Sequence, residues 1–266
     1  MRKDFISIDD SHGADETKFI ENYWTEVWNR QGGPKGEIGK IATKDEYKVI
    51  SPFLNQLPKG ARMLDGGCGL GDWTAFFTEQ GFDCVGLDLS RETVAKLHDI
   101  FPNTTFKSGD IRATEFADNS FDAYFSWGVF EHFENGMRPC IDEAFRVLKP
   151  GGQLFVSVPF DNLRHAFRAA GDWSEKKEAH RHDRRFYQWR LTKGELRDEL
   201  SAGGFDVHKI ATIHKRQGVL RSLHHEFKLN YSWFLTRGLS VALKPIIPGG
   251  LLSHMILAVA QKPFEN

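Results

Sequence analysis

Cysteine is scarce in this sequence of 266 residues, which contains three of them. Cys68, Cys84 and Cys140 cannot all pair, and no two have the spacing of zinc ligands, so neither a disulfide scaffold nor a zinc module is indicated. The polar stretch 1–13 holds no apolar region of the kind found in a secretory signal. We therefore expect a reduced, cytoplasmic protein.

Long apolar runs are also missing. The most apolar segment, 239–260, is interrupted by Lys244 and by several prolines and glycines. It therefore falls short of the roughly 18 uninterrupted apolar residues that a membrane-spanning helix needs. The neighbouring stretch 220–243 is apolar and basic, and three roles stay open for it: contact with a membrane surface, covering of an apolar substrate, and ordinary packing.

A strong overall charge is absent, because the formal net charge is −1. The charge is nevertheless uneven: residues 1–159 carry 17 Lys and Arg against 25 Asp and Glu, while residues 160–266 carry 18 against 11. An acidic half followed by a basic half suggests different partners for each, and chance distribution over solvated faces is the alternative. Near-neutral charge and the lack of an RNA-binding motif disfavour nucleic acid as a partner.

Apolar periodicity alternates between strand-like and helix-like segments over the middle of the chain. Helices are predicted over 14–30, 43–57, 71–80, 90–100, 137–148, 192–202 and 218–229, and strands over 61–64, 83–87, 104–107, 121–127, 153–158, 205–213 and 253–260. This order predicts an α/β fold with a doubly wound, seven-stranded, mostly parallel sheet. We expect a helical N-terminal cap over 1–58 and a main domain over 59–266, with insertions at about 160–190 and 215–250 that cover the substrate.

The densest motif lies where the first strand of this sheet meets a helix. Asp65 ends the strand, and the turn Gly67-x-Gly69-x-Gly71 opens the helix. Glycines let the chain turn tightly and let a ligand lie against bare backbone at the carboxyl edge of the sheet. The amides of the helix N-terminus then face that ligand. A binding site is predicted at this turn.

The acidic residues around the turn narrow the choice of ligand. A dinucleotide fingerprint needs a small residue where Asp72 stands, so NAD fits poorly. Asp88, after the second strand, can accept both ribose hydroxyls, and Leu89 offers an apolar face to adenine. Asp65 and Asp72 suit a positively charged ligand. The combination favours a cationic nucleoside without phosphate.

Further motifs follow in order along the chain. They are Asp110 in Ser108-Gly109-Asp110-Ile111, the pattern Phe121-Asp122 followed by Glu131-His132, and the turn Leu148-Lys149-Pro150-Gly151-Gly152. Together with the glycine turn and Asp88, this set resembles the class I S-adenosylmethionine-dependent methyltransferases, in their small-molecule, quinone-methyltransferase-like (type 11) branch. The resemblance is close over 61–159 and looser over 186–213. It implies the Rossmann-like methyltransferase fold, and it assigns 59–266 as the methyltransferase domain.

The resemblance also implies a site for S-adenosylmethionine. By it, Asp88 binds the ribose, Asp110 takes the adenine amino group, and the backbone at Ser126 and Trp127 lines the methionine end. The full set expected to bind the cofactor is Asp65, Gly66, Gly67, Gly69, Gly71, Asp88, Leu89, Asp110, Ile111, Ser126 and Trp127. No metal is expected, since the sequence offers no committed set of three ligands.

Methyl transfer to a nucleophile depends mostly on holding the acceptor in line with the methyl group in a dry pocket. Tyr23, Trp28 and Tyr187 are predicted to line that pocket, and Arg181 and Arg185 to bind the acceptor. Arginines suit an anionic acceptor, such as a carboxylated, phosphorylated or lipid-linked molecule.

His132, after the fourth strand, is predicted either to act as a general base or simply to line the pocket. The expected activity is methyl transfer from S-adenosylmethionine to a small-molecule or lipid-linked, anionic acceptor. The alternatives are a catalytically silent nucleoside-binding regulatory protein on the same fold and, less favoured, an NAD-dependent oxidoreductase. The oligomeric state and the atom that is methylated stay open.

Overall fold

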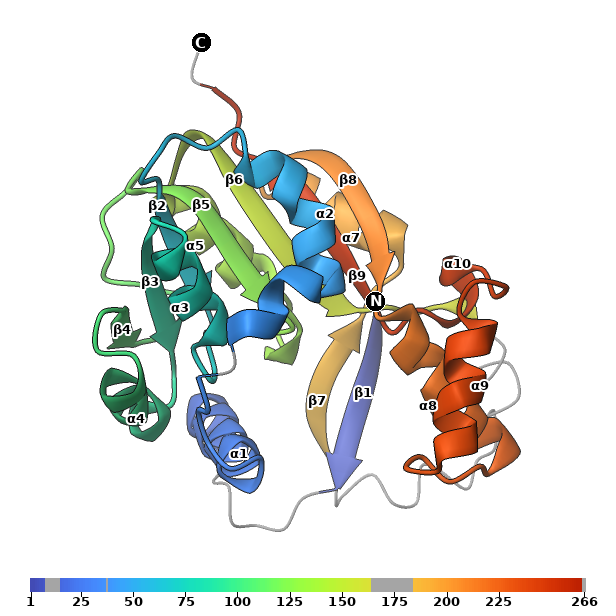
Figure 1. The fold of residues 1–266 in the computed structure, drawn as a ribbon. Coiled ribbons are helices and arrows are strands. Elements are labelled where there is room, and N and C mark those ends of the chain that lie inside the picture. The colour runs from blue at the N-terminus through green and yellow to red at the C-terminus, as the bar shows by residue number, and fades with distance from the viewer. Residues whose placement is uncertain (8–14, 37, 164–183, 265–266) are drawn as a thin grey trace.

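A seven-stranded sheet forms the centre of the molecule (Figure 1). The computed structural model describes residues 1–7, 15–36, 38–163 and 184–264. Along the sheet the strands are β4 (Thr105–Ser108), β3 (Asp83–Asp88), β2 (Arg62–Gly66), β5 (Phe121–Trp127), β6 (Leu148–Pro159), β9 (Met255–Gln261) and β8 (Asp206–Ile213). Strands β2 to β6 pair in parallel, whereas β9 is antiparallel to both of its neighbours. The predicted doubly wound, mostly parallel sheet is confirmed.

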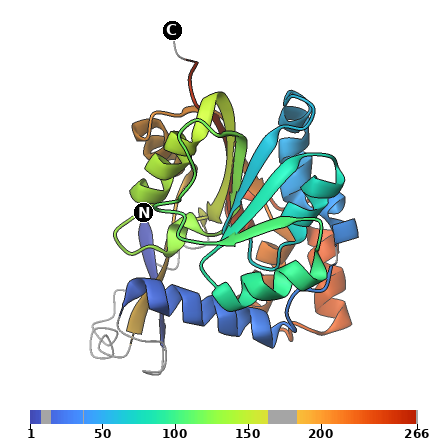
Figure 2. The same cartoon turned by 90° about the vertical axis from the view of Figure 1, so that its left-hand side faces the viewer.

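Helices cover both faces of this sheet (Figures 1 and 2). One face carries η2 (Ile38–Thr43), α2 (Asp45–Leu54) and α3 (Asp72–Glu79), and the other carries α5 (Arg138–Val147) and α7 (Lys193–Ala202). Helix α4 (Arg91–Ile100) packs beside β4, a short η3 (Phe130–His132) follows β5, and α1 (Glu16–Arg30) lies beyond the carboxyl ends of the strands. Because the helices cover the two faces of the sheet, the loops that follow several strands come together at its carboxyl edge.

The two cores arise from alternation along the buried strands. Tyr124 belongs to the core beneath α5 and α7, and its neighbour Phe125 to the core beneath α2 and α3. Both side chains are fully buried, because successive strand residues point to opposite faces and each face is covered. Strands of this sheet therefore appear in the sequence as continuous apolar runs.

Side chains at the helix ends fix where several helices begin. Ser90 caps α4 by accepting a hydrogen bond from the Thr93 N–H at 3.1 Å. Thr192 and Glu195 form a reciprocal capping box at the start of α7. These caps agree with the starts that the sequence predicts for both helices, at 90 and 192.

Two regions differ from the sequence prediction. The first residues form a strand, β1 (Arg2–Ser7), which pairs antiparallel with β7 (Arg184–Arg190) in a separate two-stranded ribbon. The N-terminal segment is thus not only helical, and part of the 160–190 insertion is strand. Both strands of the ribbon are rich in charged residues and lack the apolar alternation that predicts a strand.

The second difference lies between β8 and β9. Three helices occupy this insertion: α8 (Lys215–Phe227), α9 (Phe234–Leu243) and the short α10 (Gly249–Leu252). The apolar periodicity predicts only one helix here, over 218–229. Among the described residues, no helix is both long and apolar enough to cross a membrane.

Candidate functional site

The glycine turn after β2 has the backbone conformation that only glycine adopts readily. Gly67, Gly69 and Gly71 have φ values of +81°, +52° and +76°. A Cβ atom on Gly67 would lie 2.4 Å from a methyl group of Val129. The turn is tied to β3, because the N–H of Gly67 donates to the Leu87 carbonyl at 2.8 Å. A side chain at this turn would therefore require both backbone strain and displacement of the next loop.

Asp88 stands at the carboxyl end of β3, next to this turn. One carboxylate oxygen accepts from the Gly69 N–H at 2.8 Å, and the other accepts from the Ser90 N–H at 2.9 Å. Burial raises the pKa of Asp88 and these two backbone donors act in the opposite direction, with a net rise. The carboxylate is thus fixed in orientation and tied to the loop, while each oxygen keeps lone-pair capacity for a further donor.

Asp65 lies deeper, at the end of β2. Its side chain is 1% exposed and accepts a hydrogen bond from the Thr74 hydroxyl at 2.7 Å. Burial raises the pKa of Asp65 to about 7, and the Thr74 hydrogen bond only partly offsets that rise. Burial thus favours the protonated form of this carboxyl group.

A cavity of about 320 Å³ opens beside these groups at the carboxyl edge of the sheet. The order of strands reverses between β2 and β5, and open α/β sheets bind their ligands in such a crevice. The predicted site residues that line the cavity are Trp28, Asp65, Gly67, Gly69, Gly71, Asp88, Leu89, Ile111, Trp127 and His132. The structure thus brings together most of the residues predicted to bind the cofactor.

Three residues predicted for the cofactor do not line the cavity. Gly66 faces the Tyr124 hydroxyl, which a Cβ would approach to 2.1 Å. Ser126 is buried and donates to the Gly66 carbonyl at 2.6 Å. The carboxylate of Asp110 pairs with the Arg112 guanidinium at 2.7 Å. Gly66 and Ser126 therefore support the turn from behind.

The Asp110 pair also reaches α1. Arg112 bridges Asp110 and Glu16, because its second terminal nitrogen donates to the Glu16 carboxylate at 2.8 Å. The two contacts hold the start of α1 against the loop after β4. Asp110 thus positions the helix that closes one side of the cavity.

The residues predicted to bind the acceptor divide in the same way. Trp28 lines the cavity, whereas Tyr23 and Tyr187 are not among its lining residues and pack against each other with ring centroids 5.6 Å apart. The Arg185 guanidinium lies 4.1 Å from the centre of the Phe19 ring rather than at the cavity. Arg181 lies outside the described residues.

His132 reaches the cavity from η3 and is held by its surroundings. Its Nδ1 lies 2.7 Å from the Tyr187 carbonyl, which can only accept, so Nδ1 carries the proton of the neutral ring and Nε2 has the free lone pair. Burial lowers the pKa of His132 to about 4, although the carbonyls of Tyr187 and Gly128 oppose the shift. The ring also contacts Trp24, with centroids 5.1 Å apart. At neutral pH the imidazole is therefore unprotonated.

Comparison with known proteins agrees with this geometry. Residues 63–152, which contain the glycine turn, Asp88 and His132, match the model of a methyltransferase domain family. Residues 63–152 thus form a methyltransferase domain similar to those of class I S-adenosylmethionine-dependent methyltransferases of the small-molecule branch.

Relatives of the methyltransferase domain cover only part of the chain. A probable S-adenosylmethionine-dependent methyltransferase of Mycolicibacterium smegmatis is 28% identical over 60% of this chain and 58% of its own length. A demethylmenaquinone methyltransferase of Renibacterium salmoninarum is 37% identical over 43% of this chain and 48% of its own. The chain therefore spans about half the length of these curated relatives.

A solved structure extends the likeness in fold over nearly the whole chain. The Burkholderia thailandensis 1,6-didemethyltoxoflavin-N1-methyltransferase, solved with bound 1,6-didemethyltoxoflavin and S-adenosylhomocysteine, has a TM-score of 0.60 at 17% identity, covering 97% of this chain and 95% of that one. At this identity the likeness establishes the fold of the methyltransferase domain.

Sequence reasoning missed a polar side of the cavity. Lys44 and Glu46 line it from the start of α2, and Glu21 lines it from α1. Glu46 is buried and its carboxylate lies 2.8 Å from His214 Nε2. Burial raises the pKa of Glu46, but the hydrogen bond and charge of His214 outweigh it, so the net pKa is lowered. No local pattern marks these residues, because distant parts of the chain hold them in place.

Buried polar atoms without partners mark where a ligand fits the methyltransferase domain. The second carboxylate oxygen of Glu46 and the indole N–H groups of Trp28 and Trp127 have no hydrogen-bond partner among the described residues. All three residues line the cavity. A buried polar group left unpaired costs about 1–3 kcal/mol, so these atoms are suited to a polar ligand.

Proposed function

We propose that this chain transfers the methyl group of S-adenosylmethionine to a small-molecule acceptor at the cavity beside Asp88. The observation that carries the proposal is the fixed carboxylate of Asp88, which lines the cavity next to the glycine turn and the apolar Leu89. This combination suits a nucleoside with free ribose hydroxyls and no phosphate.

The residues around the cavity fit each part of such a cofactor. Asp88 would accept from the ribose hydroxyls, and Leu89 and Ile111 would face the adenine. The unpartnered indole N–H of Trp127 and carboxylate oxygen of Glu46 would meet the charged groups of the methionine end. The bare backbone of the turn lets the ligand approach closely.

When bound, the cofactor supplies a methyl group on a sulfonium, whose leaving thioether needs no proton. The protein's part is to align the acceptor and to exclude water, which is worth up to about 7–11 kcal/mol in favourable cases. Trp24, Trp28 and Phe133 form an aromatic wall of the cavity. Such a wall favours a flat or conjugated acceptor and keeps the site dry.

His132 acts in this proposal as the general base for an acceptor hydroxyl or acidic carbon. Its neutral ring directs a lone pair on Nε2, while the Tyr187 carbonyl fixes the tautomer. With a pKa of about 4, His132 stays unprotonated over the whole neutral range. We expect His132→Asn to lower kcat by at least about 100-fold, with KM for the cofactor unchanged. A higher KM with unchanged kcat would instead mean that His132 only lines the pocket.

The acceptor is further proposed to be anionic or lipid-linked, because of the basic residues between 160 and 190. Among the described cations of this stretch, Arg185 lies over Phe19 and Arg190 pairs with Asp4 at 2.5 Å. The anionic preference thus depends on the others, such as Arg181. This preference is tested by comparing the methylation rate of a carboxylated acceptor with that of its neutral methyl ester. Equal rates would mean that the site does not prefer an anionic acceptor.

Calorimetry with S-adenosylhomocysteine tests the cofactor site directly. Asp88→Ala removes two charge-assisted hydrogen bonds to the ribose, so affinity should fall by at least about 100-fold. Asp83→Ala is the matched control, because Asp83 begins the same strand and its side chain is 62% exposed. Thermal unfolding of both variants checks the fold. Equal affinity in the two variants, or no binding to the unaltered chain, would refute the proposal.

Product formation then separates an enzyme from a silent binder. A panel of quinols, phenols and amines with labelled S-adenosylmethionine should give a methylated product with at least one class. Cofactor binding without turnover on any of them would instead favour a regulatory protein.

A further inference from the structure

Helix α9 is oriented with its apolar side toward solvent. Its two buried residues are Thr236 and Ser240, which lie one turn apart on one side of the helix. Phe234, Leu235 and Val241 are 72%, 51% and 52% exposed. A helix at a water-facing surface normally buries its apolar stripe and exposes hydroxyls. In α9 the hydroxyl residues are buried and most apolar residues are exposed, while Leu239 and Leu243 line an apolar hollow shared with α8.

Hydroxyl contacts hold this orientation. The Ser240 hydroxyl donates to the Arg237 carbonyl at 2.6 Å and accepts from Arg216 of α8 at 3.4 Å. On the same helix, the buried Thr236 hydroxyl has no partner among the described residues. Helix α8 is in turn fixed to α10, since a Cβ on Gly218 would lie 1.5 Å from the Leu252 carbonyl oxygen. The outward apolar side is therefore part of the packed structure of the insertion.

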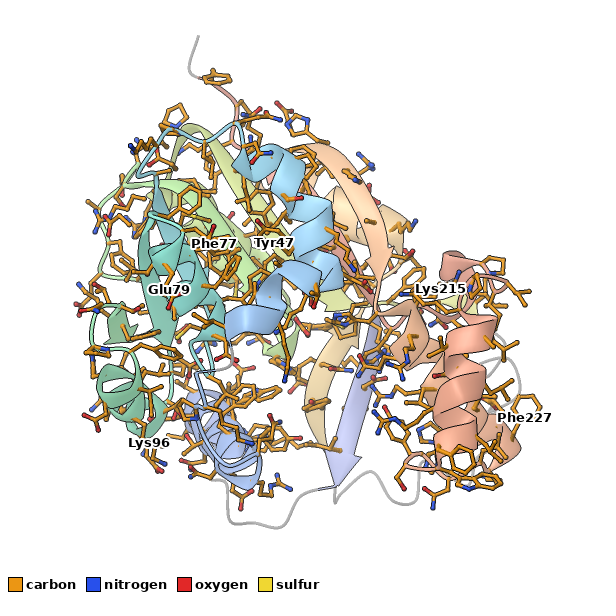
Figure 3. The ribbon with its side chains drawn as sticks, viewed as in Figure 1. Tyr47, Phe77, Glu79, Lys96, Lys215 and Phe227 are labelled. Carbon is orange, nitrogen blue, oxygen red and sulfur yellow. The ribbon has the colours of Figure 1, made fainter. Side chains whose placement is uncertain are left out.

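Exposed apolar side chains concentrate in this region. Eight of the thirteen large apolar side chains that are exposed in the described structure fall within residues 227–246. We call them the hairpin surface: Phe227, Tyr231, Trp233, Phe234, Leu235, Leu239, Val241 and Ile246. Figure 3 shows Phe227 projecting outward from α8, away from the sheet. A concentration of this kind marks an interaction surface.

The charge around the hairpin surface has one sign. Residues 215–252 contain six lysines and arginines and a single acid, Glu226. Lys228, Arg237 and Lys244 are exposed among the apolar residues. Basic side chains combined with exposed Trp, Phe and Leu are typical of segments that lie in the interface of an anionic membrane.

The hairpin surface also lies toward the substrate side of the molecule. Helices α8 and α9, α1 and the β1–β7 ribbon all project beyond the carboxyl ends of the parallel strands (Figures 1 and 2). The cavity beside Asp88 opens at this same edge of the sheet.

We propose that the hairpin surface docks onto the surface of an anionic lipid bilayer, with Trp233, Phe234 and Leu235 entering the interface and Lys228, Arg237 and Lys244 contacting lipid headgroups. A second copy of this chain is a poorer occupant, because it would bring a like-charged surface against this one. The docking needs no methyl transfer, so it is tested separately from the proposed activity.

Vesicle co-sedimentation of the full chain tests the proposal. We expect binding to mixed phosphatidylglycerol–phosphatidylcholine vesicles that weakens with added salt, and much weaker binding to phosphatidylcholine alone. The double variant Phe234→Ser/Leu235→Ser should weaken binding at least about tenfold. Each of Lys228→Gln and Lys244→Gln should weaken it about fivefold on anionic vesicles only.

Matched controls keep the result specific. Phe264→Ser removes an equally exposed aromatic residue elsewhere, and Lys59→Gln removes an exposed charge before β2. Both should bind vesicles as the unaltered chain does, and thermal unfolding should report intact folds for all variants. A blue shift of tryptophan fluorescence on anionic vesicles should be reduced in Trp233→Phe.

Three outcomes would overturn the proposal. They are failure of the unaltered chain to bind anionic vesicles at low salt, equal binding by the Phe234/Leu235 variant, and a concentration-dependent dimer in sedimentation velocity that the same variant dissociates. The last outcome would assign the hairpin surface to a second copy of the chain.

Discussion

The cavity beside Asp88 and the hairpin surface are both rich in aromatic residues, but they use them in opposite ways. Around the cavity, Trp24, Trp28 and Phe133 face inward beside fixed polar groups. On the hairpin surface, Trp233 and Phe234 are exposed beside exposed lysines. The comparison teaches that aromatic content does not identify a site. What distinguishes the two regions is whether the polar neighbours are fixed by hydrogen bonds or solvated.

Truncation of one core phenylalanine and of one on the hairpin surface should give the largest contrast. Phe125 is fully buried in the core beneath α3, so Phe125→Ala should lower the free energy of unfolding by about 3–5 kcal/mol. Phe234 is 72% exposed, so Phe234→Ala should change it by less than about 0.5 kcal/mol. Urea unfolding measures both. A large loss for Phe234→Ala would mean that the hairpin surface is covered in the isolated protein.

Adding a methyl group to the glycine turn should give the next largest effect. Gly67→Ala combines a positive φ with a Cβ contact of 2.4 Å to Val129, and it should cost about 2–4 kcal/mol of stability. Affinity for S-adenosylhomocysteine should fall with it. Unchanged stability and affinity, measured by urea unfolding and calorimetry, would show that the loop relaxes freely.

A titration experiment sharpens the contrast between fixed and solvated polar groups. Burial raises the pKa of Glu131 from 4.5 to about 8, so the folded state keeps a proton that the unfolded chain loses. The free energy of unfolding should therefore fall as pH rises from about 4.5 to 8, by at most about 1.4 kcal/mol per pH unit for this group. Glu131→Gln should remove that slope, whereas the exposed Glu79→Gln (Figure 3) should retain it. If the free energy of unfolding depended on pH in the same way in the unaltered chain and in both variants, Glu131 would not be a buried neutral carboxyl group.

The same glycine-to-alanine change in α9 should have the smallest effect and the opposite sign. Gly238 lies in the helix interior and a Cβ there meets nothing within 4 Å. Gly238→Ala should therefore raise the free energy of unfolding by about 0.5–1 kcal/mol. A destabilised variant, measured by thermal unfolding, would show that another surface packs on this side of α9.

Sequence alone predicted the parts of the molecule that local chemistry determines. The strands of the central sheet are runs of apolar residues, so they can be predicted locally. The turn around Gly69 follows one of these strands and Asp88 ends the next, so both can be placed at the same edge of the sheet. The cavity does gather those residues at one edge. The spacing did not predict that Arg112, two positions after Asp110, binds the Asp110 carboxylate and also contacts Glu16 of α1.

Long-range contacts determine the parts that sequence could not predict. Glu46 is held at the cavity by its contact with His214, which lies far along the chain. Periodicity in the sequence cannot reveal such a long-range contact. For α9, periodicity gives an apolar side but not the direction in which it points. The ribbon of β1 and β7 joins the two ends of a long stretch of chain, and each strand alone is too polar to be noticed.

That ribbon links the beginning of the chain to the imidazole at the cavity. Strand β1 is the only strand paired with β7 among the described residues, and Tyr187 of β7 presents the carbonyl that orients His132. A further indole hydrogen bond, from Trp189 to the Phe133 carbonyl at 3.0 Å, fastens β7 beside the same loop. Removal of residues 1–7 would therefore loosen the ring from a distance, so a shortened chain would keep the cavity beside Asp88 yet lose the fixed orientation of the His132 imidazole.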